Sequence, residues 1–217
     1  VSLIKKKNSK LIAHQVISLE IEALKLLKKY LNRNFDKAVN AIINCQSKII
    51  FCGVGKSGLI ASKIASTMSS VGCPAFSLSA NDCLHGDLGS ISSKDLLILI
   101  SNSGKSKELL PIIKFANRNK IKLIGIVSEK NSSLYKGSDI QILLPEVKEA
   151  GLGIVPTSST SGQLAVGDAL AVSALNKKKF SKYDFSKLHP GGNLGKQLKT
   201  VEELMVTKNK IPFINEN

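Results

Sequence analysis

Short apolar runs alternate with segments of helical periodicity along the 217-residue chain. Strands are predicted at 48–53, 75–79, 95–100, 122–127 and 140–144, and helices at 57–71, 105–119 and 160–176. Strands that alternate with helices of this length pack as a parallel sheet with helices on both faces. We therefore expect a three-layer α/β/α domain with a central, mainly parallel, five-stranded sheet, preceded by two helices within residues 1–45 (over 13–31 and 36–45). The turn-rich stretch 177–193 is expected to form an ordered loop that ends in a short helix near 194–199.

Composition limits the classes of partner. The formal charge is +15, but Arg33 and Arg118 are the sole arginines, aromatic residues make up 5% and tryptophan is absent. Because proteins that read nucleic acids use arginine forks and aromatic platforms, we expect no nucleic-acid partner. No apolar run approaches the roughly 20 residues that cross a bilayer, and the first lysines precede no signal-peptide stretch. The expected location is the cytoplasm, without a membrane partner.

The four cysteines, Cys45, Cys52, Cys73 and Cys83, form no C-x-x-C pair. This spacing does not suit a thiolate zinc site, and Cys52 lies inside an apolar strand, where a small buried thiol is ordinary. We expect reduced cysteines and no metal.

The first predicted strand leads into a glycine turn that carries one lysine. Gly53, Gly55 and Gly58 satisfy G-x-G-x-x-G, and a helix follows at once. A P-loop is excluded because its first glycine would stand at Ile50. A dinucleotide site stays open, with Asp82 at a suitable distance, although the motif alone is weak. Backbone N–H groups at such a turn bind anions, so a phosphorylated ligand is predicted.

Two further loops rich in hydroxyl groups precede predicted helices. The segment 101–106 reads Ser-Asn-Ser-Gly-Lys-Ser, and 157–161 reads Thr-Ser-Ser-Thr-Ser. A helix N-cap, at Ser103 or Ser106 in the first loop, would explain one hydroxyl of each. Several donors at a helix N-terminus suit a phosphate group. At the carboxyl ends of parallel strands, all three loops would line one crevice.

Seven motifs together carry a family resemblance. They are Gly53-Val-Gly-Lys-Ser-Gly58, His85-Gly-Asp-Leu-Gly89, Ser101-Asn-Ser-Gly104, Lys148-Glu-Ala150, Pro156-Thr-Ser-Ser-Thr160, Gly167-Asp-Ala-Leu170 and His189-Pro-Gly-Gly192. In this order the chain, from about 12 to 205, resembles arabinose-5-phosphate isomerases of the sugar isomerase (SIS) family, which displaces the dinucleotide interpretation. The resemblance implies a SIS domain over 1–200. Residues 201–217 resemble the start of a truncated C-terminal CBS region.

The resemblance implies an aldose–ketose isomerase without a cofactor. Such enzymes interconvert ribulose 5-phosphate and arabinose 5-phosphate and feed lipopolysaccharide synthesis through Kdo. The reaction needs a base that moves a proton between C1 and C2 and charges that stabilise the enediolate. A homotetramer is also implied. The alternatives are a non-catalytic sugar-phosphate sensor and an isomerase of another phosphosugar, because fold alone does not settle function.

The family's functional residues fall by motif on Lys56, Glu108, Glu149 and His189. Lys56 would stabilise the oxyanion or bind phosphate, and Glu149 is the first choice for the base. Glu108 suits the helix dipole as well as the site. His189 would assist ring opening or move protons, in its own pocket or in that of a neighbouring subunit. The implied substrate-binding residues are Gly55, Ser57, Gly72, Cys73, His85, Ser101, Asn102, Ser103, Ser106, Thr157, Ser158, Ser159 and Thr160.

Three positions depart from the family pattern. Ser79 stands where relatives often have a histidine associated with metal binding, which argues against zinc. The segment between Ala150 and Pro156 is one residue shorter, with Gly151 in place of a cysteine–proline pair, and Lys105 replaces an acid. We expect the altered loop, which adjoins Glu149, to affect substrate preference and Lys105 to change the local charge. A free glutamate titrates at about 4.3, so the base would benefit from a raised pKa.

Overall fold

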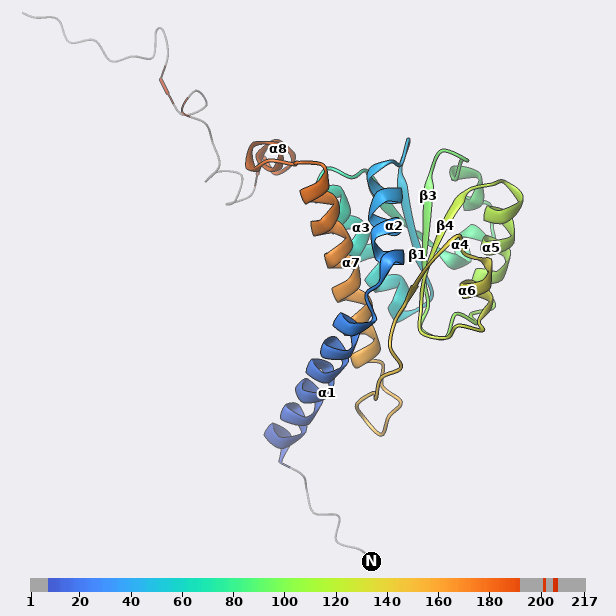
Figure 1. Ribbon diagram of the computed structural model, residues 1–217, viewed down its shortest axis with the longest axis vertical. Helices are drawn as coiled ribbons and strands as arrows, with labels where there is room; N and C mark the ends of the chain where they lie inside the picture. The colour runs from blue at the N-terminus through green and yellow to red at the C-terminus, as the bar shows by residue number, and fades with distance from the viewer. Residues whose placement is uncertain (1–7, 192–200, 202–204, 207–217) are drawn as a thin grey trace, which may run out of the picture.

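The computed structural model describes residues 8–191, 201 and 205–206 (Figure 1). Its centre is a five-stranded sheet in the order β2-β1-β3-β4-β5. The strands are β1 Ile49–Gly53, β2 Ala75–Ser79, β3 Leu96–Ile100, β4 Lys122–Val127 and β5 Ile140–Leu143. Every neighbouring pair is parallel. The predicted α/β class and five-stranded sheet are confirmed, and each predicted strand lies within one residue of the observed bounds.

Helices cover both faces of the sheet. Side chains alternate between the faces, so Phe51 and Ile98 enter one apolar cluster while Ile50 and Leu97 enter the other. The first cluster lies under α2 (Arg33–Ile43), α3 (Lys56–Ser70) and α7 (Ser158–Lys177). The second lies under α4 (Ala80–Cys83), α5 (Leu109–Arg118) and α6 (Ser133–Gly137). The two groups stand on opposite sides of the strands (Figure 1). The three-layer prediction is therefore confirmed.

The strand order positions the site. From β1 the chain crosses to β2 on one side, and β3 returns to pair with β1 on the other side. Open parallel sheets bind ligands beyond the carboxyl ends of the strands where the order reverses in this way. The turn after Gly53 and the loop after Ile100 lie at this point, because these two residues are register partners.

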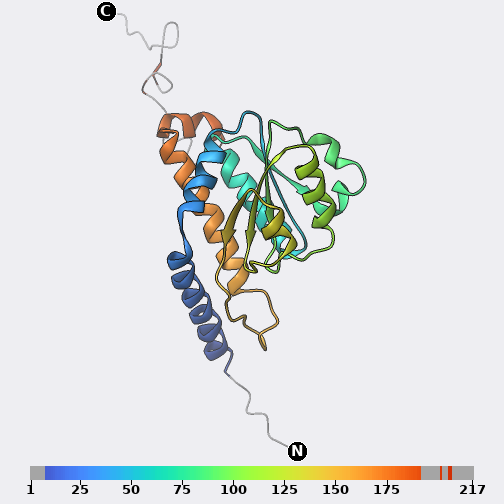
Figure 2. The same cartoon turned by 45° about the vertical axis from the view of Figure 1, so that its right-hand side comes forward.

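Two helices lie outside the three layers. The first, α1 (Ser9–Tyr30), buries Ala23 and Leu27 and otherwise projects from the body (Figure 2). The second, α8 (Lys182–Leu188), lies beyond the end of α7. None of the helices in the described ranges is long and apolar enough to cross a membrane.

Several helix predictions need correction. We expected an ordered loop where α8 forms, but Ser181 and Asp184 make a reciprocal capping box that starts a helix. The helix expected at 105–119 begins at Leu109, and the short helices α4, α6 and the 3₁₀ turn η1 (Asp87–Ser90) were not predicted. The helix expected at 194–199 and most of the C-terminal region lie outside the described residues.

Candidate active site

The glycine turn brings the start of α3 against the end of β1. A Cβ atom on Gly53 would lie 2.8 Å from the backbone of Ser57, and one on Gly58 would lie 2.8 Å from the Gly53 carbonyl oxygen. Gly55 adopts φ +57°, which favours glycine. No side chain caps α3. The turn therefore sets an uncapped helix N-terminus, with Lys56 and Ser57 in its first turn, at the switch point of the sheet.

A second helix N-terminus at this edge is occupied by a carboxylate of the chain itself. Thr157 N–H donates to Glu149 Oε2 (2.8 Å), and its hydroxyl lies 3.2 Å from the same oxygen. Ser159 N–H lies 3.3 Å from both Glu149 oxygens. Thr157 makes no side-chain cap of its own; its hydroxyl also accepts from Ala150 N–H (3.0 Å). Glu149 thus takes the place of the cap of α7.

The pKa of Glu149 is lowered rather than raised. Partial burial of the carboxyl acts to raise it, but hydrogen bonds from Ser159 and Thr157 to the charged form outweigh burial. The helix N-terminus favours the same charge. Glu149 is therefore ionised at neutral pH. A raised pKa would make Glu149 a stronger base at neutral pH, but the structure lowers the pKa of Glu149 instead.

The cleft between these two helix starts has a volume of about 380 Å³. Its walls come from all three predicted loops, which confirms that they converge. The lining residues are Val54, Lys56, Ser57, Asn102, Glu149, Pro156, Ser159, Thr160 and Gln163. Sequence reasoning missed Val54, Pro156 and Gln163. The polar Gln163 on the buried face of a predicted helix, one turn after Ser159, was the available signal.

The hydroxyl groups of the loop after β3 mostly shape the loop. Ser101 Oγ accepts from Gly104 N–H (3.1 Å) and lies 3.2 Å from Ser106 Oγ. Ser103 Oγ accepts from Lys105 N–H (3.3 Å). Neither Ser103 nor Ser106 caps α5, so the simple capping interpretation is wrong here.

Asn102 is the member of this loop that lines the cleft. Ser128, after β4, donates its hydroxyl to the Asn102 backbone carbonyl (2.6 Å) and lies 3.1 Å from its side-chain oxygen. Lys105, which replaces an acid, forms an ion pair with Glu129. Glu108 stands directly before α5, half-buried, and is not among the lining residues.

Gly72, Cys73 and His189 lie away from this cleft within one chain. Gly72 and Cys73 connect α3 to β2, at the amino edge of the sheet. Lys178 Nζ, at the C-terminal end of α7, donates to the Gly72 carbonyl oxygen (2.5 Å). His189 follows α8, with Nδ1 2.8 Å from the Phe185 carbonyl oxygen and its ring stacked on Phe185. The 20 residues of α7, a rise of about 30 Å, separate this group from Glu149.

The remaining predicted residues lie at the carboxyl edge. His85 is exposed in the turn between α4 and η1, after the end of β2. Ser79 caps α4, its hydroxyl accepting from Asp82 N–H (3.4 Å).

All four cysteines are free. Within the described ranges, no group of three or more His, Cys, Asp or Glu side chains is placed to hold a metal.

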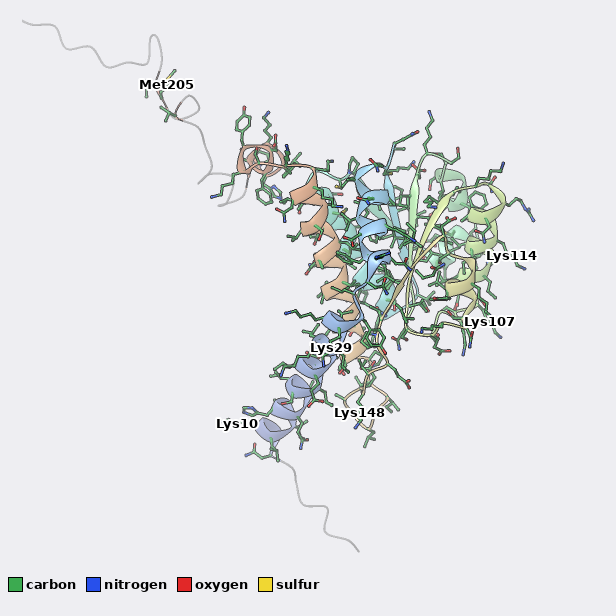
Figure 3. The ribbon with its side chains drawn as sticks, viewed as in Figure 1. Lys10, Lys29, Lys107, Lys114, Lys148 and Met205 are labelled. Atoms are coloured by element: carbon green, nitrogen blue, oxygen red, sulfur yellow. The ribbon has the colours of Figure 1, made fainter. Side chains whose placement is uncertain are left out.

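Lysines are distributed over separate parts of the surface. Lys10 and Lys29 lie on α1, Lys107 and Lys114 lie on the α5 side of the sheet, and Lys148 lies near the start of α7 (Figure 3). This distribution differs from the single basic face of a nucleic-acid-binding domain.

An open parallel sheet with a polar cleft at its switch point defines an α/β ligand-binding domain. The SIS domain family matches residues 42–173, and the chain belongs to this family. Arabinose 5-phosphate isomerase KdsD of Yersinia pestis is 42% identical over 203 residues, which are 93% of this chain and 62% of that protein. The chain thus spans less than two thirds of that relative.

Two further similarities extend this result. RP505 of Rickettsia prowazekii, whose function is uncharacterized, is 38% identical over 215 residues, 99% of this chain and 67% of that protein. The structure of Escherichia coli CFT073 c3406 in complex with arabinose 5-phosphate superposes with a TM-score of 0.77 at 35% identity. The superposed region covers 84% of this chain and 100% of the c3406 chain.

Proposed function

We propose that this chain is an aldose–ketose isomerase that interconverts ribulose 5-phosphate and arabinose 5-phosphate. The observation that carries the proposal is the ionised Glu149 carboxylate, held at the start of α7 in the same cleft as Lys56. The likeness to arabinose 5-phosphate isomerase KdsD supports it. Supply of the arabinose phosphate for Kdo and lipopolysaccharide synthesis in the cytoplasm belongs to the same proposal.

The chemistry assigns one step to each group. Glu149 removes the proton from C1 of the ketose, the electron pair forms the C1–C2 double bond, and the carbonyl oxygen becomes an enediolate oxygen. The Lys56 ammonium stabilises that negative charge. A proton then moves from the C1 hydroxyl to the C2 oxygen, and the carboxylic acid returns its own proton to C2, which leaves the carbonyl on C1 and Glu149 again as a carboxylate. No electron donor or acceptor enters, so the reaction needs no redox cofactor.

The phosphate group belongs at the uncapped start of α3. Ser57 supplies a hydroxyl beside the first-turn N–H groups, and Asn102 supplies an amide across the cleft. Ser101, Ser103 and Ser106 contribute by holding the shape of that loop. Thr157, Ser158, Ser159 and Thr160 begin α7, where the first and third hold Glu149.

Residues from a second copy complete the site in this proposal. Gly72 and Cys73 lie at the opposite end of α7, and His189 follows α8 beyond that end, so the three are too far from Glu149 to share its substrate within one chain. In a homotetramer, this end of one subunit would face the cleft of another, and His189 would assist ring opening there. Glu108 and His85 contribute from the edges of the cleft.

The test is incubation of the native chain with ribulose 5-phosphate in deuterated water, followed by NMR. We expect arabinose 5-phosphate with deuterium at the carbon that receives the proton. Glu149→Gln should lower kcat by about 10²- to 10⁴-fold, the usual contribution of a general base. Glu146→Gln, an exposed glutamate three residues earlier, is the matched control and should keep full activity. Binding without turnover by the native chain would favour a sensor and contradict the proposal.

A further inference from the structure

Gln163 is a buried polar side chain that the isomerase chemistry does not use. It lies on α7 with 1% of its surface exposed. Within the described residues, neither its amide nitrogen nor its amide oxygen has a hydrogen-bond partner. Most buried side-chain polar atoms in proteins are paired, so an amide with both atoms unpaired requires an explanation.

The position of Gln163 connects it to the cleft. It lines the same cleft as Lys56, Ser57 and Glu149. It also follows Ser159 by four residues, so the two side chains lie on one face of α7. Ser159 N–H contacts the Glu149 carboxylate. Gln163 therefore stands one helical turn below the proposed base.

Ser158 provides a contrast on the same helix. Its hydroxyl is also buried and unpaired within the described residues, but it borders a small cavity of about 10 Å³. That space is near the minimum for one water molecule. Gln163 borders the open cleft of about 380 Å³, which is large enough for a ligand. The two unpaired groups thus differ in what can reach them.

The chemistry of the Gln163 amide indicates which chemical group of a ligand would pair with both of its polar atoms. A carboxamide offers N–H donors and one carbonyl acceptor. A phosphate at neutral pH mainly accepts hydrogen bonds and would leave the carbonyl unpaired, whereas a sugar hydroxyl both donates and accepts. Both amide atoms are shielded from solvent, so contact requires a change of side-chain rotamer, which is common on binding.

We propose that Gln163 is a specificity-determining residue that binds a hydroxyl group of the sugar and not its phosphate. The proposal rests on the proposed isomerase function, because it concerns the same cleft. It separates two tasks along the cleft, with the phosphate at the start of α3 and a sugar hydroxyl at the second turn of α7. A substrate of equal charge but without that hydroxyl would be discriminated against at this residue.

Gln163→Met tests this assignment because methionine has a similar length and suits an apolar site. Titration calorimetry should show that arabinose 5-phosphate binds roughly 5- to 100-fold more weakly to the variant. Inorganic phosphate should bind equally to both proteins. The thermal midpoint should stay equal or rise, since the variant no longer buries an unpaired amide.

Gln141→Met is the matched control. The Gln141 amide is paired, donating to the Ser138 carbonyl oxygen (2.5 Å), and it lies on β5 away from the cleft. Its replacement should lower the thermal midpoint and leave arabinose 5-phosphate binding unchanged. A role for Gln163 in packing alone would make the two variants behave alike.

The outcomes separate this proposal from the proposed function. Equal arabinose 5-phosphate affinity in native and Gln163→Met chains would overturn the role of Gln163, whatever the native turnover. Weaker sugar binding by the variant, with no turnover by the native chain, would keep the role and reject the isomerase. A native chain that binds inorganic phosphate but not arabinose 5-phosphate would overturn both.

Discussion

Glu149 and Asp95 are two partly or fully buried carboxylates at opposite edges of one sheet. Glu149 follows β5 at the carboxyl edge, and Asp95 precedes β3 at the amino edge. Both pKa values are lowered, although burial acts to raise each. Asp95 accepts from Ser92 N–H (2.6 Å) and from Lys48 Nζ (2.9 Å), and its side chain has no exposed surface. Glu149 accepts from the start of α7 but still lines a cleft.

The difference shows why a lowered pKa does not by itself identify a site. The Asp95 carboxylate oxygens accept hydrogen bonds from Lys48 and from Ser92. The charge of Asp95 therefore serves to stabilise the fold. Glu149 uses its charge to begin a helix and keeps access to a ligand. The same electrostatic rule therefore produces a structural anchor at one edge and a candidate base at the other.

Removal of the Asp95 charge should have the largest effect on stability. Asp95→Asn leaves Lys48, one third exposed, without its partner and weakens two bonds to Ser92. Loss of one partner of a buried pair costs about 3 kcal/mol of unfolding free energy at the low end of the usual range. Urea unfolding measures this loss. Unchanged stability, or weaker sugar-phosphate binding by the folded variant, would break the contrast with Glu149.

The pH dependence of stability should report the same carboxylate. The pKa of Asp95 is lowered to about 2 in the folded chain, from 3.8. Its contribution is therefore fully present above the unfolded pKa and is lost as the pH falls toward about 2. By linkage this is about 2 to 3 kcal/mol between about pH 5 and pH 2. The unfolding free energies of the native and Asp95→Asn chains, measured across this pH range, should converge at the acidic end. Curves of unfolding free energy against pH that stay parallel would refute the assignment.

Replacement of Glu149 should affect stability less than replacement of Asp95. Glutamine keeps one oxygen for Thr157 N–H but loses the charge at the helix start, so Glu149→Gln should cost about 1 kcal/mol, as other N-terminal caps do. Urea unfolding and NMR turnover on one preparation make the comparison. A loss as large as that of Asp95→Asn would show that Glu149 is mainly a structural anchor.

The sequence predicted the sheet better than it predicted the site. Strands that are buried on both faces appear in the sequence as continuous apolar runs, such as Leu96–Ile100. Such runs can be recognised from the local sequence alone. The three loops also converge as expected, because parallel strands place their carboxyl ends at one edge. The late start of α5 was not predictable, since the Ser101 and Ser106 hydroxyls bond within their loop instead of capping a helix.

Other features of the site depend on contacts distant in sequence. The separation of Gly72 and His189 from Glu149 follows from the length and direction of α7, which no motif encodes. The unpaired amide of Gln163 is likewise a property of packing. The lowered pKa of Glu149 depends on a loop that folds its carboxylate back onto Thr157 and Ser159.

The smallest effect is expected at a third carboxylate, Asp168, which calibrates the other two. Asp168 forms an ion pair with Lys63 across α7 and α3 (2.5 Å), but both side chains are more than two fifths exposed. Water screens such a pair, so Asp168→Asn should change the unfolding free energy by about 0.5 kcal/mol, and less in 1 M salt. Urea unfolding at two salt concentrations measures both values. An effect near that of Asp95→Asn would mean that burial does not rank these carboxylates, because exposure is the main difference between the two ion pairs.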